Sequence, residues 1–178
     1  MLVLETERLV LIALTREHLE LALSNIDQLA ADLKIQASEE VFSDESRQAM
    51  MIKMSRMDHV ERQLHSWYTY FLLVQRVDRQ AVGVCGFKGQ PTLYGSVELG
   101  YAMHEGFRNR GYMTEAVRGM VQWAFTHDNC TCVTVETLRD NFASQKVLTK
   151  AGLTLHRAAE KMLYWKVDKN HNGAGFGE

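Results

Sequence analysis

Apolar and polar residues follow two different periods along this chain, which indicates a mixture of strands and helices. Short runs of apolar and β-branched residues, bounded by turn-forming residues, predict strands. Such runs lie at residues 9–14, 68–77, 81–87, 97–104 and 131–136, and a final hairpin is expected over residues 153–167. Asp78-Arg79-Gln80 is a tight turn between two of these runs, so the middle strands are predicted to form an antiparallel meander.

Apolar residues spaced three and four apart predict four helices, at residues 15–24, 44–64, 112–127 and 141–150. Thr15 is a suitable N-cap for the first helix, and Gly152 follows the last as a C′ glycine. The second helix carries a stripe of methionines that is expected to face the core, at Met50, Met51, Met54 and Met57. The order of the elements predicts a mixed α/β fold with a mostly antiparallel sheet, in which the helix at 112–127 is a crossover.

The chain has 178 residues, a single proline and no internal repeat, which predicts one domain over residues 1–168. The last residues are rich in glycine and lack any periodicity. Residues 169–178 are therefore expected to form a flexible tail.

Charge and cysteine content exclude several classes of partner. The formal charge is −2, from 20 Lys and Arg against 22 Asp and Glu, whereas binding to nucleic acid needs a surplus of basic residues. The apolar runs are far shorter than the roughly 20 residues that cross a bilayer, and Glu5 and Glu7 do not fit a signal peptide. The three cysteines are an odd number, which favours reduced thiols. We expect a cytoplasmic protein with neither a membrane nor a nucleic-acid partner.

Residues 99–116 carry the clearest sign of chemistry, because a strand there leads through a charged loop into a helix. The loop is RNRG at residues 108–111, and the helix begins near Tyr112. The first turn of a helix presents unpaired backbone N–H groups with positive potential, and the two arginines add formal charge. Gly111 allows the backbone to approach a ligand closely. The stretch therefore predicts a binding loop for a phosphate or pyrophosphate.

Neither a Walker loop nor a dinucleotide-binding glycine fingerprint is present in this stretch. The spacing Arg108-x-x-Gly111-x-Met113 instead resembles the R/Q-x-x-G-x-G/A acetyl-CoA motif of the GNAT (Gcn5-related N-acetyltransferase) superfamily. Other segments resemble its RimJ/RimL-like branch: ETERLVL from Glu5, GFKG from Gly86, ELGY from Glu98, and NFASQKVL from Asn141 followed by KAGL. The resemblance covers about residues 5–167 and departs from the motif at Met113, where the family has Gly or Ala.

The resemblance implies a GNAT-like fold, in which helices flank a mostly antiparallel central sheet that contains a splayed strand pair. It implies acetyl-CoA as the acyl donor, with the pantetheine arm paired to a strand edge near Met103. It also implies that Asn141 hydrogen-bonds the arm and that Ser144 protonates the departing sulfur. The residues that would hold the pyrophosphate are Arg108, Asn109, Arg110, Gly111, Tyr112, Met113 and Thr114.

In this family an amine attacks the thioester directly, a step that needs a base for the ammonium proton and a donor for the thiolate. Glu98, on the strand that enters the site, and Glu136, at the end of the next strand, are alternative candidates for the base. The resemblance implies a primary amine as acceptor, either a protein N-terminus or a small amine. A homodimer is also an expectation from the family.

These residues also have plain structural interpretations. Asn141 suits a helix cap, Ser144 suits a packing hydroxyl, and charged loops are commonly solvated turns. His127, Cys130 and Cys132 lack an evident fourth ligand, so no metal is expected. The favoured function is an acetyl-CoA-dependent N-acetyltransferase, and the alternative is a non-catalytic acyl-CoA sensor or scaffold. A nucleotide hydrolase would need the missing Walker lysine.

Overall fold

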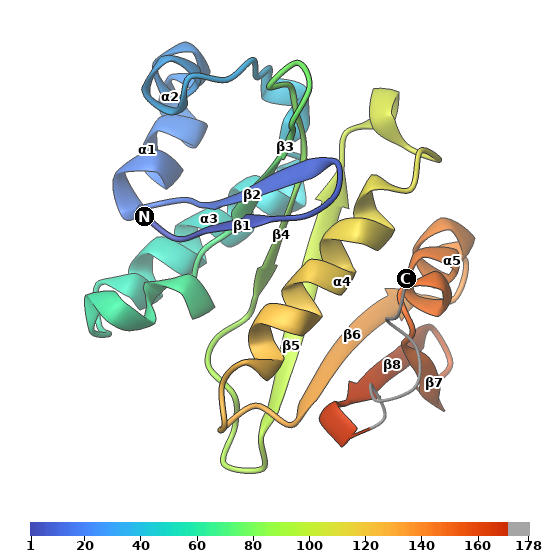
Figure 1. Ribbon diagram of the computed structural model, residues 1–178. Coiled ribbons are helices and arrows are strands. Elements are labelled where there is room, and N and C mark those ends of the chain that lie inside the picture. The colour runs from blue at the N-terminus through green and yellow to red at the C-terminus, as the bar shows by residue number, and fades with distance from the viewer. Residues whose placement is uncertain (171–178) are drawn as a thin grey trace.

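The computed structural model describes residues 1–170, whose strands form one eight-stranded sheet in the order β1-β2-β3-β4-β5-β6-β8-β7 (Figure 1). Neighbouring strands are antiparallel except β5 and β6, which are parallel. The expected mixed α/β fold with a mostly antiparallel sheet is therefore confirmed. The strands are β1 (Val3–Glu5), β2 (Leu9–Ala13), β3 (Phe71–Gln75), β4 (Ala81–Phe87), β5 (Ser96–Met103), β6 (Cys132–Leu138), β7 (Thr154–Ala158) and β8 (Met162–Asp168).

Helices cover both faces of the sheet, with α1, α2 and α3 on one face and α4 and α5 on the other (Figure 1). Alternate strand residues serve different cores: Leu11 and Leu73 pack with α4, whereas Ile12 and Leu72 pack with α1, α2 and α3. The sheet therefore separates two apolar cores. The helices are α1 (Arg16–Ser24), α2 (Ile26–Leu33), α3 (Asp44–Met57), α4 (Tyr112–Phe125) and α5 (Phe142–Lys150), with 3-10 segments η1 (Glu39–Val41), η2 (Arg62–Trp67) and η3 (Glu105–Phe107).

Side-chain caps hold the ends of these helices where the sequence predicts them. The Thr15 hydroxyl accepts a hydrogen bond from the His18 N–H at 3.2 Å, which starts α1. Asn141 Oδ1 accepts one from the Ser144 N–H at 3.0 Å, which starts α5. Gly152 follows α5 with a φ of 92°, a left-handed conformation that favours glycine. The predicted N-cap of α1 and both ends of α5 are confirmed.

The helix expected at residues 44–64 is too long, because α3 ends at Met57. The chain turns there and enters η2, which carries Trp67 into the core. Its ring packs 5.0 Å from that of Phe87 and 4.6 Å from that of Trp123. Burial of a large aromatic side chain outweighs the local preference for a longer helix.

The sequence pattern does not predict β1 or α2, and it overstates the methionine stripe. A single residue separates α1 from α2: Asn25 ends α1 by donating its N–H to Leu21 O, and its Oδ1 caps α2. Because no loop separates the two helices, the sequence pattern does not show where α1 ends and α2 begins. In α3, Met50 and Met57 are buried as expected, whereas Met51 is 63% exposed because the next residue on a helix points about 100° away.

β5 and β6 diverge after three paired positions, which opens the sheet at one end. Their parallel ladder joins residues 96–98 to residues 132–134. Beyond it, β5 continues along β4 and β6 continues along β8, and no pairing joins β5 to β6 again within residues 1–170. Figure 1 shows the two strands close together at one end and apart at the other. The expected splayed strand pair is confirmed, and the space between its diverging ends is called the splay opening below.

The tail expected at residues 169–178 lies mostly outside the described residues, which end at Asn170. Lys169 follows β8 and donates its N–H to Thr131 O at 2.8 Å. None of the helices in residues 1–170 combines the length and the apolar character needed to cross a membrane.

Candidate active site

The edge of β5 that borders the splay opening carries backbone groups without a strand partner. Glu98 O accepts a hydrogen bond from the Lys88 N–H at 2.9 Å on the opposite edge. Backbone groups of successive residues alternate between the two edges, so the Glu98–Thr134 rung uses the N–H of Leu99, and the C=O of Leu99 and the N–H and C=O groups of Tyr101 and Met103 face the opening. No strand in residues 1–170 pairs with this edge beyond Glu98. The edge can therefore accept an extended ligand as an added strand.

The loop after β5 brings an uncapped helix N-terminus to the open end of the splay. Asn109 and Gly111 both have left-handed backbones, with φ of 62° and 81°, which turn the chain into α4. Gly111 begins α4 without a side-chain hydrogen bond, whereas side chains cap the other four α-helices of residues 1–170. The N–H groups of the first turn therefore stay available to an anion.

Met113 occupies the position where the acetyl-CoA motif has a small residue. Its side chain is 5% exposed and packs in the core beneath α4, with Ala116 and Val117. The side chain thus points away from the loop, and its N–H belongs to the first turn of α4. The departure from the motif therefore does not fill the loop at residues 108–111, which is called the anion-binding loop below after the binding that the sequence predicts.

Arg108 and Arg110 are both exposed on this loop, as expected. Arg108 forms an ion pair with Glu105 at 3.1 Å. The guanidinium of Arg110 lies 5.3 Å from the centre of the Phe107 ring. Both residues directly precede Gly111, the N-cap of α4, so their charges lie near the positive end of the helix dipole.

The turn between β1 and β2 contacts this loop and the first turn of α4 through hydrogen bonds. Arg8 donates to Arg110 O at 2.9 Å and to Glu115 Oε2 at 2.7 Å, and the Thr6 hydroxyl donates to Glu115 Oε1 at 2.6 Å. Burial alone would raise the pKa of Glu115, but the hydrogen bonds from Thr6 and Arg8 outweigh it and lower that pKa. Sequence reasoning misses this contact, because 107 positions separate Arg8 from Glu115.

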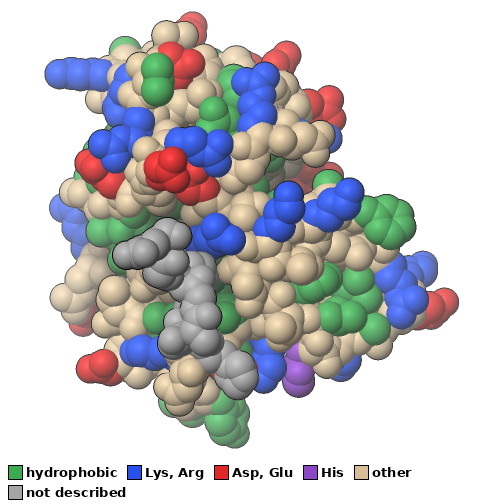
Figure 2. Space-filling model, turned by 45° about the vertical axis from the view of Figure 1, so that its right-hand side comes forward, with side chains coloured by type: hydrophobic (Ala, Val, Ile, Leu, Met, Phe, Trp, Pro, Cys, Tyr) green, Lys and Arg blue, Asp and Glu red, His purple; other side chains and the backbone are tan. Residues whose placement is uncertain are grey.

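A groove of about 530 Å³ runs beside the loop along α4. It begins at Gly111 and Thr114, at the start of α4. The charged residues of its lining are the cations Arg8, Arg118 and Lys150 and the carboxylates Glu5, Glu7 and Glu115. Figure 2 views this side of the molecule, where Lys and Arg side chains run in a band across the surface. The groove itself is lined by equal numbers of cations and carboxylates, so the positive potential is concentrated at the loop and the N-terminus of α4.

Ser144 and Asn141 lie at the start of α5, beside the splay opening. The Ser144 hydroxyl is 2.6 Å from the hydroxyl of Tyr101 on β5, and either oxygen can donate. Burial raises the pKa of Tyr101 to about 12, although the hydrogen bond with Ser144 acts in the opposite direction. The structure thus joins the predicted Ser144 to a tyrosine that sequence reasoning does not single out.

Glu98 and Glu136 point to the face of the sheet that α1, α2 and α3 cover. Leu99 packs with α4, so its neighbour Glu98 faces the other side. Glu98 is in register with Thr134, and Glu136 follows two residues later, so both carboxylates share that face. Glu98 forms an ion pair with Lys88, and Glu136 is exposed. The two candidate bases therefore lie across the sheet from Ser144.

The cysteines lie in places that suit packing. Cys85 is in register with Tyr101 but is buried, and burial raises the pKa of its thiol well above the usual range. Cys132 is at the closed end of the splay, where it pairs with Ser96. In the part of the chain that the structure describes, no three His, Cys, Asp or Glu side chains are grouped to hold a metal ion.

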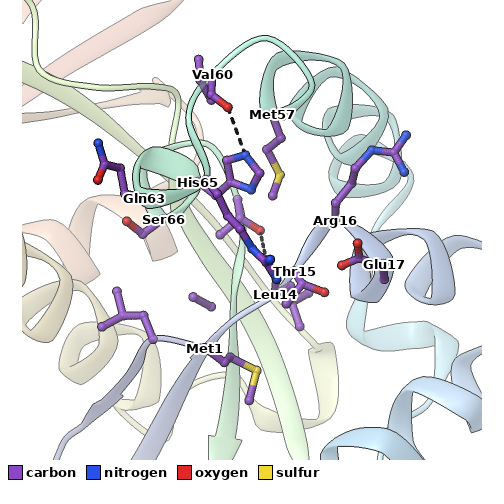
Figure 3. Close-up of a pocket in the computed structure, with 14 residues that line it drawn as sticks. Met1, Leu14, Thr15, Arg16, Glu17, Met57, Val60, Gln63, His65 and Ser66 are labelled. Atoms are coloured by element: carbon purple, nitrogen blue, oxygen red, sulfur yellow. Dashed lines mark hydrogen bonds between the residues drawn. The ribbon is translucent and has the colours of Figure 1, made fainter.

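A second cavity, of about 560 Å³, lies away from the splay opening. Figure 3 shows Thr15 and Glu17 at the start of α1, Met57 at the end of α3, and His65 in η2 around it. No residue of β5, α4, β6 or α5 lines it. It is therefore separate from the candidate site.

Comparison with known proteins extends the similarity over most of the chain. Residues 8–154 match the family model described as Acetyltransferase (GNAT) domain. The protein described as "Uncharacterized N-acetyltransferase YjdG" of Bacillus subtilis (strain 168) is 30% identical over 95 residues, which are 53% of this chain and 56% of that protein. The match spans little more than half the length of the curated relatives.

Solved structures share the fold at low sequence identity. The RimL ribosomal L7/L12 alpha-N-protein acetyltransferase in complex with coenzyme A has a TM-score of 0.65 and 16% identity, over 94% of this chain and 98% of the other. The Salmonella typhimurium acetyltransferase described as modifying the N-terminal serine of protein L7/L12 has a TM-score of 0.66 and 15% identity, over 94% and 99%. Because the family model matches more than half of the residues, this chain belongs to the GNAT acetyltransferase family.

Proposed function

We propose that this chain transfers the acetyl group of acetyl-CoA directly to a primary amine. The observation that carries the proposal is the splay opening, which combines a free strand edge, an uncapped helix N-terminus and the Tyr101–Ser144 pair. An extended pantetheine arm, a pyrophosphate and a departing thiolate need these three kinds of contact. The RimL structure named as a complex with coenzyme A supports the choice of ligand.

The coenzyme lies along β5 and ends on α4. Its pyrophosphate binds the N–H groups of residues 111–114, with Arg108 and Arg110 supplying charge and Asn109 turning the loop. Its pantetheine arm pairs with the free edge of β5 as far as Met103. Asn141 Oδ1 already caps α5, so the Nδ2 protons of Asn141 remain to donate to a carbonyl of the arm.

The amine approaches from the opposite face of the sheet, where Glu98 and Glu136 lie. One of these carboxylates accepts the proton that the ammonium ion loses, directly or through a water. The amine nitrogen then forms a bond to the thioester carbon, and the C–S bond breaks with its electron pair on sulfur. Ser144 gives the sulfur a proton and regains one through solvent, which takes up the second proton that the nitrogen loses as the amide forms. Acetyl-CoA and an ammonium ion thus become an amide, the coenzyme thiol and one released proton.

Peptides with a free N-terminus are the first acceptors to test, with small amines beside them. The support is the Salmonella typhimurium neighbour, which is described as modifying an N-terminal serine. In this chain, the exposed carboxylate of Glu136 on the acceptor face favours a cationic amine over a neutral nucleophile, whereas the charge of Glu98 is balanced by Lys88.

Thiol release from acetyl-CoA, measured against a panel of N-terminal peptides and small amines, tests the proposal. We expect release that depends on the acceptor. Glu98→Gln and Glu136→Gln then identify the base, because its loss lowers kcat by about 10²- to 10⁴-fold. Tight binding of acetyl-CoA in calorimetry, without release for any acceptor, would contradict transfer and favour the acyl-CoA sensor or scaffold.

A further inference from the structure

Tyr101 and Ser144 meet across the border between β5 and α5, although 43 positions separate them in the chain. The phenol oxygen of Tyr101 is 2.6 Å from Ser144 Oγ and 3.4 Å from the backbone oxygen of Ser144. Both residues are half-buried. A hydrogen bond between two hydroxyls this close uses the proton of one of them, so the accepting hydroxyl keeps its own proton for another partner.

We propose that Tyr101 is a positioning residue for Ser144, donating its phenol proton to Ser144 Oγ so that the serine's own proton points at the departing sulfur. This inference rests on the proposed acetyl transfer. It adds to that function a residue that acts through Ser144 and does not itself contact the sulfur.

Two observations make the phenol the donor. First, the phenol has one proton and two oxygens of Ser144 within reach, the hydroxyl oxygen at 2.6 Å and the carbonyl oxygen at 3.4 Å. Because a phenol is a stronger acid than an aliphatic hydroxyl, its proton goes to the nearer oxygen, Oγ. Second, burial raises the pKa of Tyr101 to about 12, so the phenol keeps its proton at neutral pH. With Oγ accepting, the hydrogen of Ser144 is free to turn into the splay opening.

The proton transfers balance with the acetyl transfer. As the C–S bond breaks, its electron pair moves to sulfur, and the proton of Ser144 forms the S–H bond. Ser144 Oγ takes the phenol proton of Tyr101 at the same time. The phenolate then regains a proton from solvent, which has received one from the acceptor amine. The phenol is a stronger acid than an aliphatic hydroxyl, so this coupling eases the departure of the thiolate.

Tyr101→Phe tests the inference, because it removes only the hydroxyl and keeps the ring. The expected result is a fall in kcat of about tenfold, the effect of losing one hydrogen bond in the transition state. The KM and the dissociation constant for acetyl-CoA should stay unchanged, because the backbone edge of β5 is intact. Tyr68→Phe is the matched control: this half-buried tyrosine bonds Gln90 at 3.3 Å, and its change should leave kcat unaltered.

The double variant separates positioning from an independent effect. In a chain that already carries Ser144→Ala, Tyr101→Phe should cause no further loss of kcat, because the phenol acts through the serine. Losses that multiply in the double variant, a full rate in Tyr101→Phe, or a weaker affinity for acetyl-CoA at unchanged kcat would each overturn the inference while the parent stays active. If the parent releases no thiol with any acceptor, the proposed function fails and the inference fails with it.

Discussion

Arg108 and Arg110 have the same charge but different neighbours on the anion-binding loop. The ion pair with Glu105 neutralises part of the charge of Arg108. The Phe107 ring orients Arg110 without neutralising it. We therefore expect Arg110 to contribute more to the affinity for the coenzyme than Arg108.

Arg108→Ala and Arg110→Ala should each weaken CoA binding, by about 10- to 150-fold if a charge-assisted hydrogen bond is lost. The lower end is expected, because the N–H groups of α4 remain. The rate at saturating acetyl-CoA should hardly change, since these contacts are the same in the ground and transition states. Calorimetry with CoA and with 3′-dephospho-CoA measures the affinities, and both ligands should weaken alike.

Arg16→Ala is the control for these variants, because Arg16 begins α1 on the opposite face of the sheet. It should bind CoA as the parent does. Parental affinity in both loop variants would mean that the pyrophosphate binds elsewhere.

Lys53 is a buried lysine of α3 whose amine bridges the residues before β3 and the end of β4. Its Nζ donates to Phe87 O at 2.6 Å and to Thr69 O at 3.2 Å, and it lies 4.6 Å from the centre of the Tyr70 ring. Burial lowers the pKa of Lys53 to about 7, and nearby Arg56 acts in the same direction. The folded protein therefore releases this proton at a lower pH than the unfolded chain.

Stability should rise with pH above about 7 and up to the usual lysine pKa of about 10.5. In that window the unfolded chain holds the Lys53 proton and the folded protein does not, so the free energy of unfolding rises by up to about 1.4 kcal/mol per pH unit. Urea unfolding of the parent and of Lys53→Met between pH 7 and 8.5 measures the difference in slope. Equal slopes in the two proteins would show that Lys53 does not titrate there.

At the scale of elements, one edge of β5 pairs with β4, and the other edge is proposed to pair with the coenzyme. In deuterium exchange without coenzyme, the amides of Gly100 and Ala102 should be protected by β4, whereas those of Tyr101 and Met103 should exchange fast. Saturating CoA should slow the second set and leave the first unchanged, because the pantetheine arm supplies its acceptors. Exchange unaltered by CoA at Tyr101 and Met103 would contradict strand-like binding of the arm.

Elements with a long or clean pattern are predictable from the sequence, and elements set by a single contact are not. The strand at residues 81–87 and the start of α4 follow directly from periodicity and turn residues. The early end of α3 depends on the burial of Trp67, and α2 depends on Asn25 serving two helices. Local propensity contains neither kind of information.

At the scale of the whole molecule, part of the candidate site is predictable from the sequence and part is not. The anion-binding loop is contiguous, so its four residues are visible in the sequence. The contacts of Tyr101 with Ser144 and of Arg8 with Glu115 join segments 43 and 107 positions apart, and only the folded chain brings them together. From the sequence alone, Met113 is a departure from the motif, and only the structure shows that its side chain lies in the core.

The three cysteines should be dispensable, because neither their positions nor their ionisation suits an acyl-enzyme. Cys85 and Cys130 are buried and have raised pKa values, and the pKa of Cys132 is raised to about 11. Replacing all three by alanine should leave acetyl transfer largely intact. Mass spectrometry of the parent mixed with acetyl-CoA alone should find no acetylated cysteine. A folded triple variant without turnover would contradict direct transfer.

A sheet that divides two cores makes this fold modular in an evolutionary sense. Drift in residues 14–57, the block from the end of β2 through α3, is absorbed by the core beneath α1, α2 and α3, whereas Trp67 in η2 already packs in the other core. The core beneath α4 keeps its packing meanwhile, and with it the anion-binding loop. New acceptors are therefore accessible by exchanging that block as a unit, without rebuilding the half that holds the coenzyme. The central strands β2, β3, β4 and β5 set the limit of such exchange, because their two faces border both cores.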